Sequence, residues 1–159
     1  MLSRTAPKFN NGLLRYTLHL VTTAINLLKE ESTVSRELLT VAAFLQEAGI
    51  ADKYTYKGQT KSFVLSSRGM LIDDAFTVLE WLTTAVERYQ INLPTKDYIN
   101  LVHAIGADKS GHVPANHLIS LNKEAKVISI AKKCTYIQHE LTTMEIVSRN
   151  NIFQLTTIH

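Results

Sequence analysis

Several residue types that identify common functional classes are scarce in this chain. Cys134 is the only cysteine among 159 residues, so an internal disulfide and a cysteine-rich zinc site are both excluded. A single cysteine fits a reducing compartment, and we expect a cytoplasmic protein in which Cys134 is a small buried hydrophobic residue. The sequence has no low-complexity segment and no internal repeat that we can detect.

Long apolar runs are also missing. No window of 18 apolar residues exists, so we expect no transmembrane helix and no membrane partner. The first 29 residues contain Arg4, Lys8 and Arg15 but no acidic residue before Glu30, a composition that resembles a mitochondrial presequence. Because the apolar residues of this segment continue into an amphipathic pattern, we interpret it as part of the folded protein.

The overall composition is that of an ordinary globular protein. Hydrophobic residues make up 45% of the chain, which argues against disorder. The length allows one domain with a real core, or a small domain with a helical extension. Lysine and arginine outnumber the acidic residues by 17 to 14, for a net charge of +3. This balance is compatible with a polyanionic partner without requiring one.

The first half of the chain predicts two helices. The first begins after Gly12, and its apolar stripe has the 4-3-4-3 spacing of a helix face. The stripe comprises Leu14, Leu18, Val21, Ile25 and Leu28. The second helix has Leu38, Ala42 and Leu45 on its inner face, with Ser32, Thr33 or Ser35 as its cap. We expect Gly49 to end it in a left-handed conformation.

A change to a two-residue period after Lys53 predicts a β-hairpin. Tyr54 and Tyr56 alternate with polar residues, and Phe63 and Leu65 continue the alternation on the return strand, as half-buried strands do. We expect a turn over residues 57–60 in which Gly58 adopts a positive φ.

The rest of the sequence predicts further helices. One is capped by Ser66 or Ser67 and runs to about residue 91, and a short one covers residues 96–105. After a loop over residues 106–114, a long helix follows from about residue 115. Its apolar stripe comprises Val127, Ala131, Cys134, Ile137, Leu141, Met144 and Val147. This stripe suits packing either against a second copy of the chain or back onto the first helix.

The segment from Thr33 to Gly69 resembles part of the winged-helix regulators of the MarR and PadR type. The matching residues are Leu45, Gly49, Ile50, Lys57, Gly58, Lys61, Leu65, Ser66 and Gly69. The resemblance implies a wing along the DNA backbone and a helix in the major groove. The implied DNA contacts are Arg36, Thr40, Gln46, Lys53, Lys57, Lys61 and Arg68. The helix has few basic residues and carries Glu37 and Glu47, so we expect backbone contacts to dominate.

Other signals for chemistry are weak. Residues 106–113 resemble a calcium-binding EF-hand loop, but Gly106 stands in place of the first Asp ligand and His117 in place of the Glu ligand, so no calcium site is predicted. His103, His112 and His117 lack the spacing of a zinc chelate. No nucleophile elbow and no glycine-rich phosphate loop is present. We therefore predict no catalytic residues, no metal and no cofactor.

These observations predict a mainly α fold with a small β-hairpin. We expect residues 1–92 to form a winged-helix-like domain and residues 93–159 a helical extension that can mediate dimerisation. The predicted function is that of a non-enzymatic transcriptional regulator that binds double-stranded DNA as a homodimer. The alternative is a non-enzymatic helical protein–protein interaction module, such as an adaptor or inhibitor.

Overall fold

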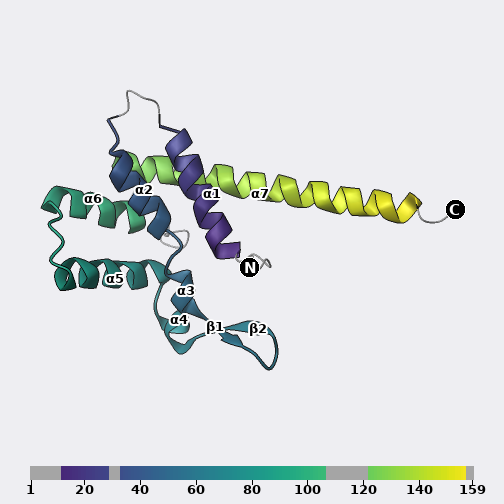
Figure 1. Ribbon diagram of the computed structural model, residues 1–159, viewed down its shortest axis with the longest axis horizontal. Coiled ribbons are helices and arrows are strands. Elements are labelled where there is room, and N and C mark those ends of the chain that lie inside the picture. Colours follow the sequence, from purple (N-terminus) through teal and green to yellow (C-terminus); the bar gives the residue numbers. More distant parts are fainter. Residues whose placement is uncertain (1–11, 29–32, 107–121, 157–159) are drawn as a thin grey trace.

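The computed structural model describes residues 12–28, 33–106 and 122–156. It is mainly helical with one small antiparallel hairpin, as the sequence predicts (Figure 1). In chain order, the elements are α1 (Gly12–Asn26), α2 (Arg36–Leu45), α3 (Ile50–Lys53), β1 (Tyr54–Lys57), β2 (Ser62–Leu65), α4 (Ser67–Leu71), α5 (Asp74–Arg88), α6 (Thr95–Gly106) and α7 (Lys123–Thr156).

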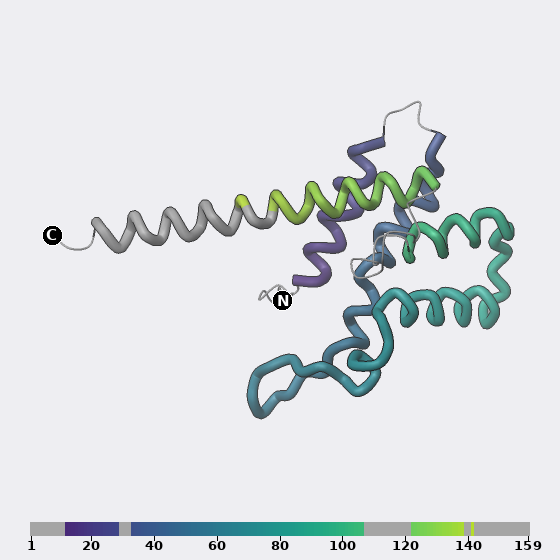
Figure 2. Tube along the Cα trace, turned by 180° about the vertical axis from the view of Figure 1, so that it is seen from behind, coloured from purple at the N-terminus to yellow at the C-terminus, as the bar shows by residue number. Residues whose placement is uncertain are grey.

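One hydrophobic core is built from helices that lie early and late in the sequence. The helix α2 packs against α1, α6 and α7, and Leu20, Leu39, Ile105 and Ile128 are fully buried between them. Residues on both sides of position 92 contribute to this core. Figure 2 shows the hairpin projecting from the end of the body away from α7.

The helix α1 packs only part of its predicted stripe on the core, through Val21 and, just after the end of the helix, Leu28, which are partly buried. Its buried residues are Thr17, Leu20 and Ala24, whereas Leu14 and Leu18 are exposed. Both faces of this helix carry leucine, so apolar spacing alone cannot choose between them. With Leu20 at its centre and the smaller Thr17 and Ala24 beside it, this face packs against both α2 and α7.

The first cap was predicted correctly, whereas the glycine conformations were not. The Ser35 hydroxyl caps α2 by accepting a hydrogen bond from the Leu38 amide at 3.2 Å. Gly49 has φ of −63° and leads directly into α3, so the left-handed stop is wrong. The hairpin turn takes its positive φ at Lys61, not at Gly58. Neither Gly49 nor Gly58 therefore has the positive φ that the sequence predicts.

The helix predicted from Ser66 or Ser67 to about residue 91 is two helices, α4 and α5. The break has a physical cause. The Asp73 carboxylate accepts a hydrogen bond from the Ala75 amide at 2.8 Å, so it starts a new helix. Ser66 caps α4 in the same way. The short helix predicted at 96–105 is confirmed as α6, which begins at Thr95.

The last helix also buries a different stripe from the predicted one. Its buried residues are Glu124, Ala125, Ile128, Ala131 and Thr135. Of the predicted stripe only Ala131 is fully buried, and Ile137 and Leu141 are exposed. The side chains of Met144 and Val147 lie outside the described residues, as do the EF-hand-like loop after Gly106, His112 and His117.

Two chemical findings hold for the part of the chain that the structure describes. None of its helices combines the length and the apolar character needed to span a bilayer. Within the same ranges, no three histidine, cysteine, aspartate or glutamate side chains gather where they could hold a metal ion.

Candidate interaction surface on the hairpin

The base of the hairpin is fastened to the body by hydrogen bonds around Ser66. The Ser66 amide donates to the Lys53 carbonyl at 3.0 Å, and the Ser66 hydroxyl donates to the Asp52 carbonyl at 3.0 Å. The same hydroxyl accepts a hydrogen bond from the Gly69 amide at 2.9 Å. One side chain therefore joins the end of α3 to the start of α4 and fixes where the hairpin leaves the body.

Two of the predicted DNA contacts belong to this base. Arg68 Nε lies 3.0 Å from Asp52 Oδ2, and the Arg68 guanidinium also pairs with Glu80. Lys53 Nζ lies 3.7 Å from Asp74 Oδ1. These cations already have carboxylate partners within the chain, so a phosphate would have to compete for them. Their arrangement favours a structural role in positioning the hairpin.

The remaining two cations of the predicted wing lie at its tip. Lys57 ends β1 and Lys61 occupies the turn, and both are exposed. Neither forms an ion pair with any residue in the described ranges. The tip therefore carries positive charge that none of the described residues neutralises.

One face of the hairpin is apolar and open to solvent. In the register of the strands, Tyr54 lies opposite Leu65 and Tyr56 lies opposite Phe63, so these four side chains share one face. The Tyr56 and Phe63 rings lie 5.2 Å apart between centroids. Exposed fractions are 54% for Tyr56, 70% for Phe63 and 41% for Leu65. We call these three residues the hairpin face.

More apolar side chains follow in the next helix. Met70 and Leu71 of α4 are 63% and 87% exposed, and α4 packs against β2. Scattered exposed leucines are normal on a protein surface, whereas several large apolar side chains on adjoining elements mark an interaction site. The hairpin and α4 together carry five such exposed side chains, namely Tyr56, Phe63, Leu65, Met70 and Leu71.

The helix predicted to enter the DNA groove, α2, packs against α1, α6 and α7 on its inner face and is exposed at Arg36 and Glu37. Gln46, which directly follows α2, is fully buried. Its Nε2 donates a hydrogen bond to the Ala104 carbonyl at 2.8 Å. This burial removes Gln46 from the residues that could contact DNA. The Thr40 hydroxyl donates to the Arg36 carbonyl at 2.7 Å within α2. Arg36 is exposed at the start of the helix.

The sequence does not predict an exposed hairpin face, because alternating apolar and polar residues indicate a strand with its apolar side buried. The alternation itself is correct, since Tyr54, Tyr56, Phe63 and Leu65 do share a face. The error concerns what covers that face, which depends on how the hairpin leaves the body and not on its own sequence. The paired aromatic residues beside the turn were the available signal.

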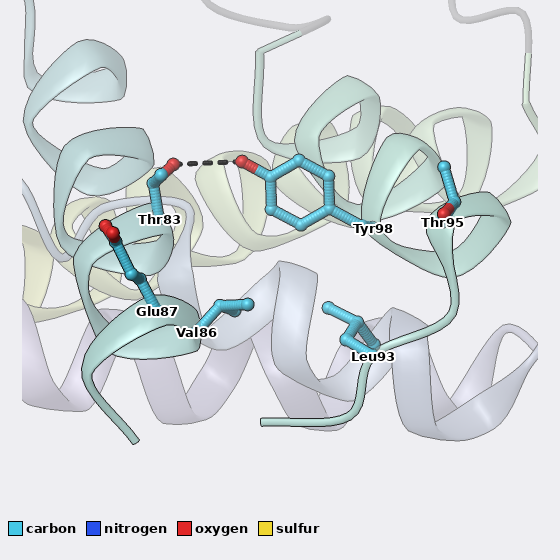
Figure 3. A pocket seen from close by; sticks show the side chains of 6 residues that line it. All are labelled: Thr83, Val86, Glu87, Leu93, Thr95 and Tyr98. Atoms are coloured by element: carbon cyan, nitrogen blue, oxygen red, sulfur yellow. Dashed lines mark hydrogen bonds between the residues drawn. The ribbon is translucent and has the colours of Figure 1, made fainter. Parts of the chain in front are cut away.

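A second surface feature is an open hollow between α5 and α6. Figure 3 shows the Thr83 hydroxyl and the Tyr98 hydroxyl joined by a hydrogen bond of 2.9 Å across it. The Thr83 hydroxyl also donates to the Leu79 carbonyl at 2.9 Å. Val86, Glu87, Leu93 and Thr95 complete the lining. These contacts tie α5 to α6, and we assign the hollow no further role.

Comparison with protein families, curated proteins and solved structures gives no match to this chain.

Proposed function

We propose that this protein is a non-enzymatic protein-interaction module that binds its partner through the hairpin face. The observation that carries the proposal is the exposure of Tyr56, Phe63 and Leu65 on one side of a hairpin that projects from the body (Figure 2). The single cysteine of the chain fits a reducing compartment. We therefore place the module in the cytoplasm.

The small size of the sheet supports this proposal. Within the described residues the sheet has two strands of four residues each, and an isolated two-stranded hairpin is marginally stable in water. Both of its edges have unpaired backbone groups, and such edges accept an added strand from another chain. A partner that covers the hairpin face would bury aromatic side chains, which dominate binding energy at interfaces.

The chemistry of the surface also suggests the kind of partner. Its centre is apolar and aromatic, and Lys57 and Lys61 lie at the tip beside it. Complementary charge at the rim of an interface accelerates association and excludes wrong partners. We therefore expect a protein whose docking site is apolar at its centre and acidic at its edge.

A photo-crosslinking experiment tests this function directly. We place p-benzoylphenylalanine at Phe63 and irradiate the source cells. We expect a single cross-linked product that contains this chain and one partner protein. Phe63 is 70% exposed, so the larger aromatic group leaves the fold intact. The control places the same group at Asn92, which is exposed in the connection between α5 and α6 and lies outside the hairpin. Mass spectrometry identifies the products.

The outcome separates this function from nucleic-acid binding. Tyr56→Ser with Phe63→Ser should abolish the cross-link from a group placed at Leu65, because the aromatic anchors are lost. Gln59→Ser should leave it unchanged. Recovery of nucleic acid without any protein, or equal cross-linking from Asn92, would reject the protein-interaction module.

Duplex DNA binding is a second candidate, and the free cations at the hairpin tip favour it. In this reading the protein is a winged-helix regulator whose wing grips the backbone through Lys57 and Lys61. On α2, Arg36 is exposed and Thr40 is partly buried, and both would add contacts to the DNA. With few cations available, sequence-independent backbone contacts dominate.

A gel-shift series tests the second candidate. If Lys57 and Lys61 contact phosphate, we expect binding to random duplex at low salt, and Lys57→Ala with Lys61→Ala should reduce the slope of log K against log salt by about 2. Gln59→Ala serves as the control in the same turn and should have no effect. Absence of binding at low salt, or a salt slope that the double substitution leaves unchanged, would reject this candidate.

A further inference from the structure

The hydrogen-bond alternation of the hairpin shows which of its backbone groups point outward. At the base, the Ser66 amide donates to the Lys53 carbonyl at 3.0 Å, and the register of the strands continues from this pair. In an antiparallel ladder, hydrogen-bonded pairs alternate with pairs whose backbone groups point away from each other. The next pair, which contains Leu65, is therefore of the second kind, and so is the pair of Tyr56 and Phe63. The amide and carbonyl groups of Phe63 and Leu65 point to the open edge of β2.

This edge of β2 offers two complete residues for pairing with another strand. Within the described ranges, no backbone hydrogen bond outside the ladder involves Phe63 or Leu65. The β1 edge offers less, because Tyr54 is the C-cap of α3 and its amide belongs to the last turn of that helix. β2 also has neither a charged residue nor a proline, the residues that commonly block pairing at an edge strand. The β2 edge is therefore the better template for a third strand.

The charge beside β2 differs between the two ends of the strand. At the base, Arg68 pairs with Asp52 and Glu80. At the turn, Lys61 directly precedes β2 and Lys57 lies opposite its first residue, and neither lysine forms an ion pair with a described residue. A segment lying along β2 would therefore meet uncompensated positive charge at the turn and a neutralised cation at the base. A carboxylate on that segment fits at the turn.

We propose that the partner of the hairpin binds by adding an extended strand to the β2 edge, antiparallel to β2. This inference rests on the proposed function and specifies the form of the partner. Antiparallel pairing is the more stable arrangement per residue, and it runs the added strand from the base of the hairpin to its turn. Side chains opposite Leu65 and Phe63 then lie on the hairpin face, and the next one on that side reaches Lys61. From its N-terminal end, the partner segment has the pattern apolar, any residue, apolar, any residue, acidic.

A third strand would stabilise the sheet as well as the complex. A two-stranded hairpin is marginally stable in water, whereas three strands with a hydrophobic face are stable. The added strand places two apolar side chains beside Phe63 and Leu65, which are 70% and 41% exposed in the free protein. Main-chain hydrogen bonds then provide affinity, and the alternate side chains provide specificity.

A synthetic peptide tests strand addition on the full chain. The probe is Val-Thr-Val-Thr-Glu with an N-terminal fluorescein label, and fluorescence anisotropy measures its binding. In the proposed pairing both valine amides face β2 and both threonine amides face away from it. We expect saturable binding that weakens by at least about tenfold when both valine amides are N-methylated. Methylation of both threonine amides is the control with the same composition, and it should leave the affinity unchanged.

A matched set of protein variants tests which edge is used. Proline is tolerated in an edge strand where the N–H that it lacks faces solvent. Phe63→Pro removes the outward amide together with the ring, whereas Phe63→Ala removes only the ring. Phe63→Pro should therefore bind the peptide at least about fivefold more weakly than Phe63→Ala. Tyr56→Pro and Tyr56→Ala make the same comparison on the β1 edge and should bind equally. Far-UV circular dichroism checks that all four variants fold.

The charge of the peptide provides a further test. Lys57→Gln with Lys61→Gln should weaken binding of the Glu peptide but not of a peptide that ends in Gln. Absence of binding, equal binding of the two methylated peptides, equal binding by Phe63→Pro and Phe63→Ala, or an equal effect of the lysine substitutions on both peptides would each overturn the proposal. If p-benzoylphenylalanine at Phe63 still cross-links one protein, the proposed function stands although strand addition is rejected.

Discussion

Gly49→Ala is expected to destabilise the protein by about 3 kcal/mol or more, although the substitution adds a single methyl group. A Cβ atom built on Gly49 would lie 2.1 Å from the Asp74 carbonyl oxygen and 2.8 Å from its carbon. Both atoms belong to the backbone at the start of α5, so no side chain can move aside to relieve the clash. The substitution must push α3 away from α5. Chemical denaturation of the purified protein measures the loss.

Two other glycines supply the controls for this prediction. A Cβ on Gly69 would lie 2.2 Å from the Lys53 carbonyl oxygen, so Gly69→Ala should be damaging to a similar degree. Gly58 in the hairpin turn has nothing within 4 Å of the added atom and no positive φ. Gly58→Ala should therefore be neutral or stabilise by up to about 1 kcal/mol. If Gly49→Ala and Gly58→Ala lose the same stability, Gly49 does not lie as close to the backbone of α5 as described.

These glycines also show which kind of inference the sequence allowed. The sequence correctly predicted that a hairpin follows the second helix and that Ser66 or Ser67 caps the next helix, whereas the second helix ends at Leu45 and not at Gly49. It attributed the glycines to backbone freedom, whereas Gly49 is needed for close packing against a segment 25 positions away. Local signals such as caps and alternation act over a few residues and can be read directly. A close approach between distant segments cannot.

The same limit explains the faces of the helices and the candidate surface. Leu14 and Leu18 satisfy helical spacing as well as Leu20 and Ala24 do, and only the positions of α2 and α7 decide between them. In the hairpin, alternation predicts which side chains share a face but not which face the body covers. Pairing of Lys53 and Arg68 with carboxylates also arises between elements that are separate in sequence. Basic composition therefore overstated the free positive charge of the ribbon.

Gln46→Glu is expected to have the other large effect, and the effect should depend on pH. Gln46 is fully buried, and its Nε2 donates to the Ala104 carbonyl near the end of α6. Carbonyl groups in the last turn of a helix lack partners within that helix, so this amide acts as a cap. A carboxylate at the same place would lose the donor and bring negative charge to the negative end of the helix dipole.

The sign of the pH dependence follows from the proton balance. Burial and the nearby carbonyl raise the pKa of the introduced carboxyl in the folded state, so the fold binds a proton that the unfolded chain releases. Stability should then fall by about 1.4 kcal/mol for each pH unit above about 4.3, until the pH exceeds the raised pKa. Chemical denaturation of Gln46→Glu and of wild type at about pH 5 and about pH 7 gives the stability that the variant loses at each pH. We expect this loss to be about 3 kcal/mol larger at about pH 7 than at about pH 5.

Gln46→Met separates charge from packing at this position. Methionine has a similar length and no buried acceptor, so it removes Gln46 Oε1, which has no hydrogen-bond partner, but it leaves the Ala104 carbonyl without its donor. Losing one buried hydrogen bond costs about 1 to 3 kcal/mol, and this cost should not change with pH. If Gln46→Glu and Gln46→Met lose equal stability at both pH values, Gln46 fills space and does not cap α6. A loss that grows with pH in Gln46→Glu alone shows that the introduced carboxyl is buried, and the constant loss in Gln46→Met measures the hydrogen bond to the Ala104 carbonyl.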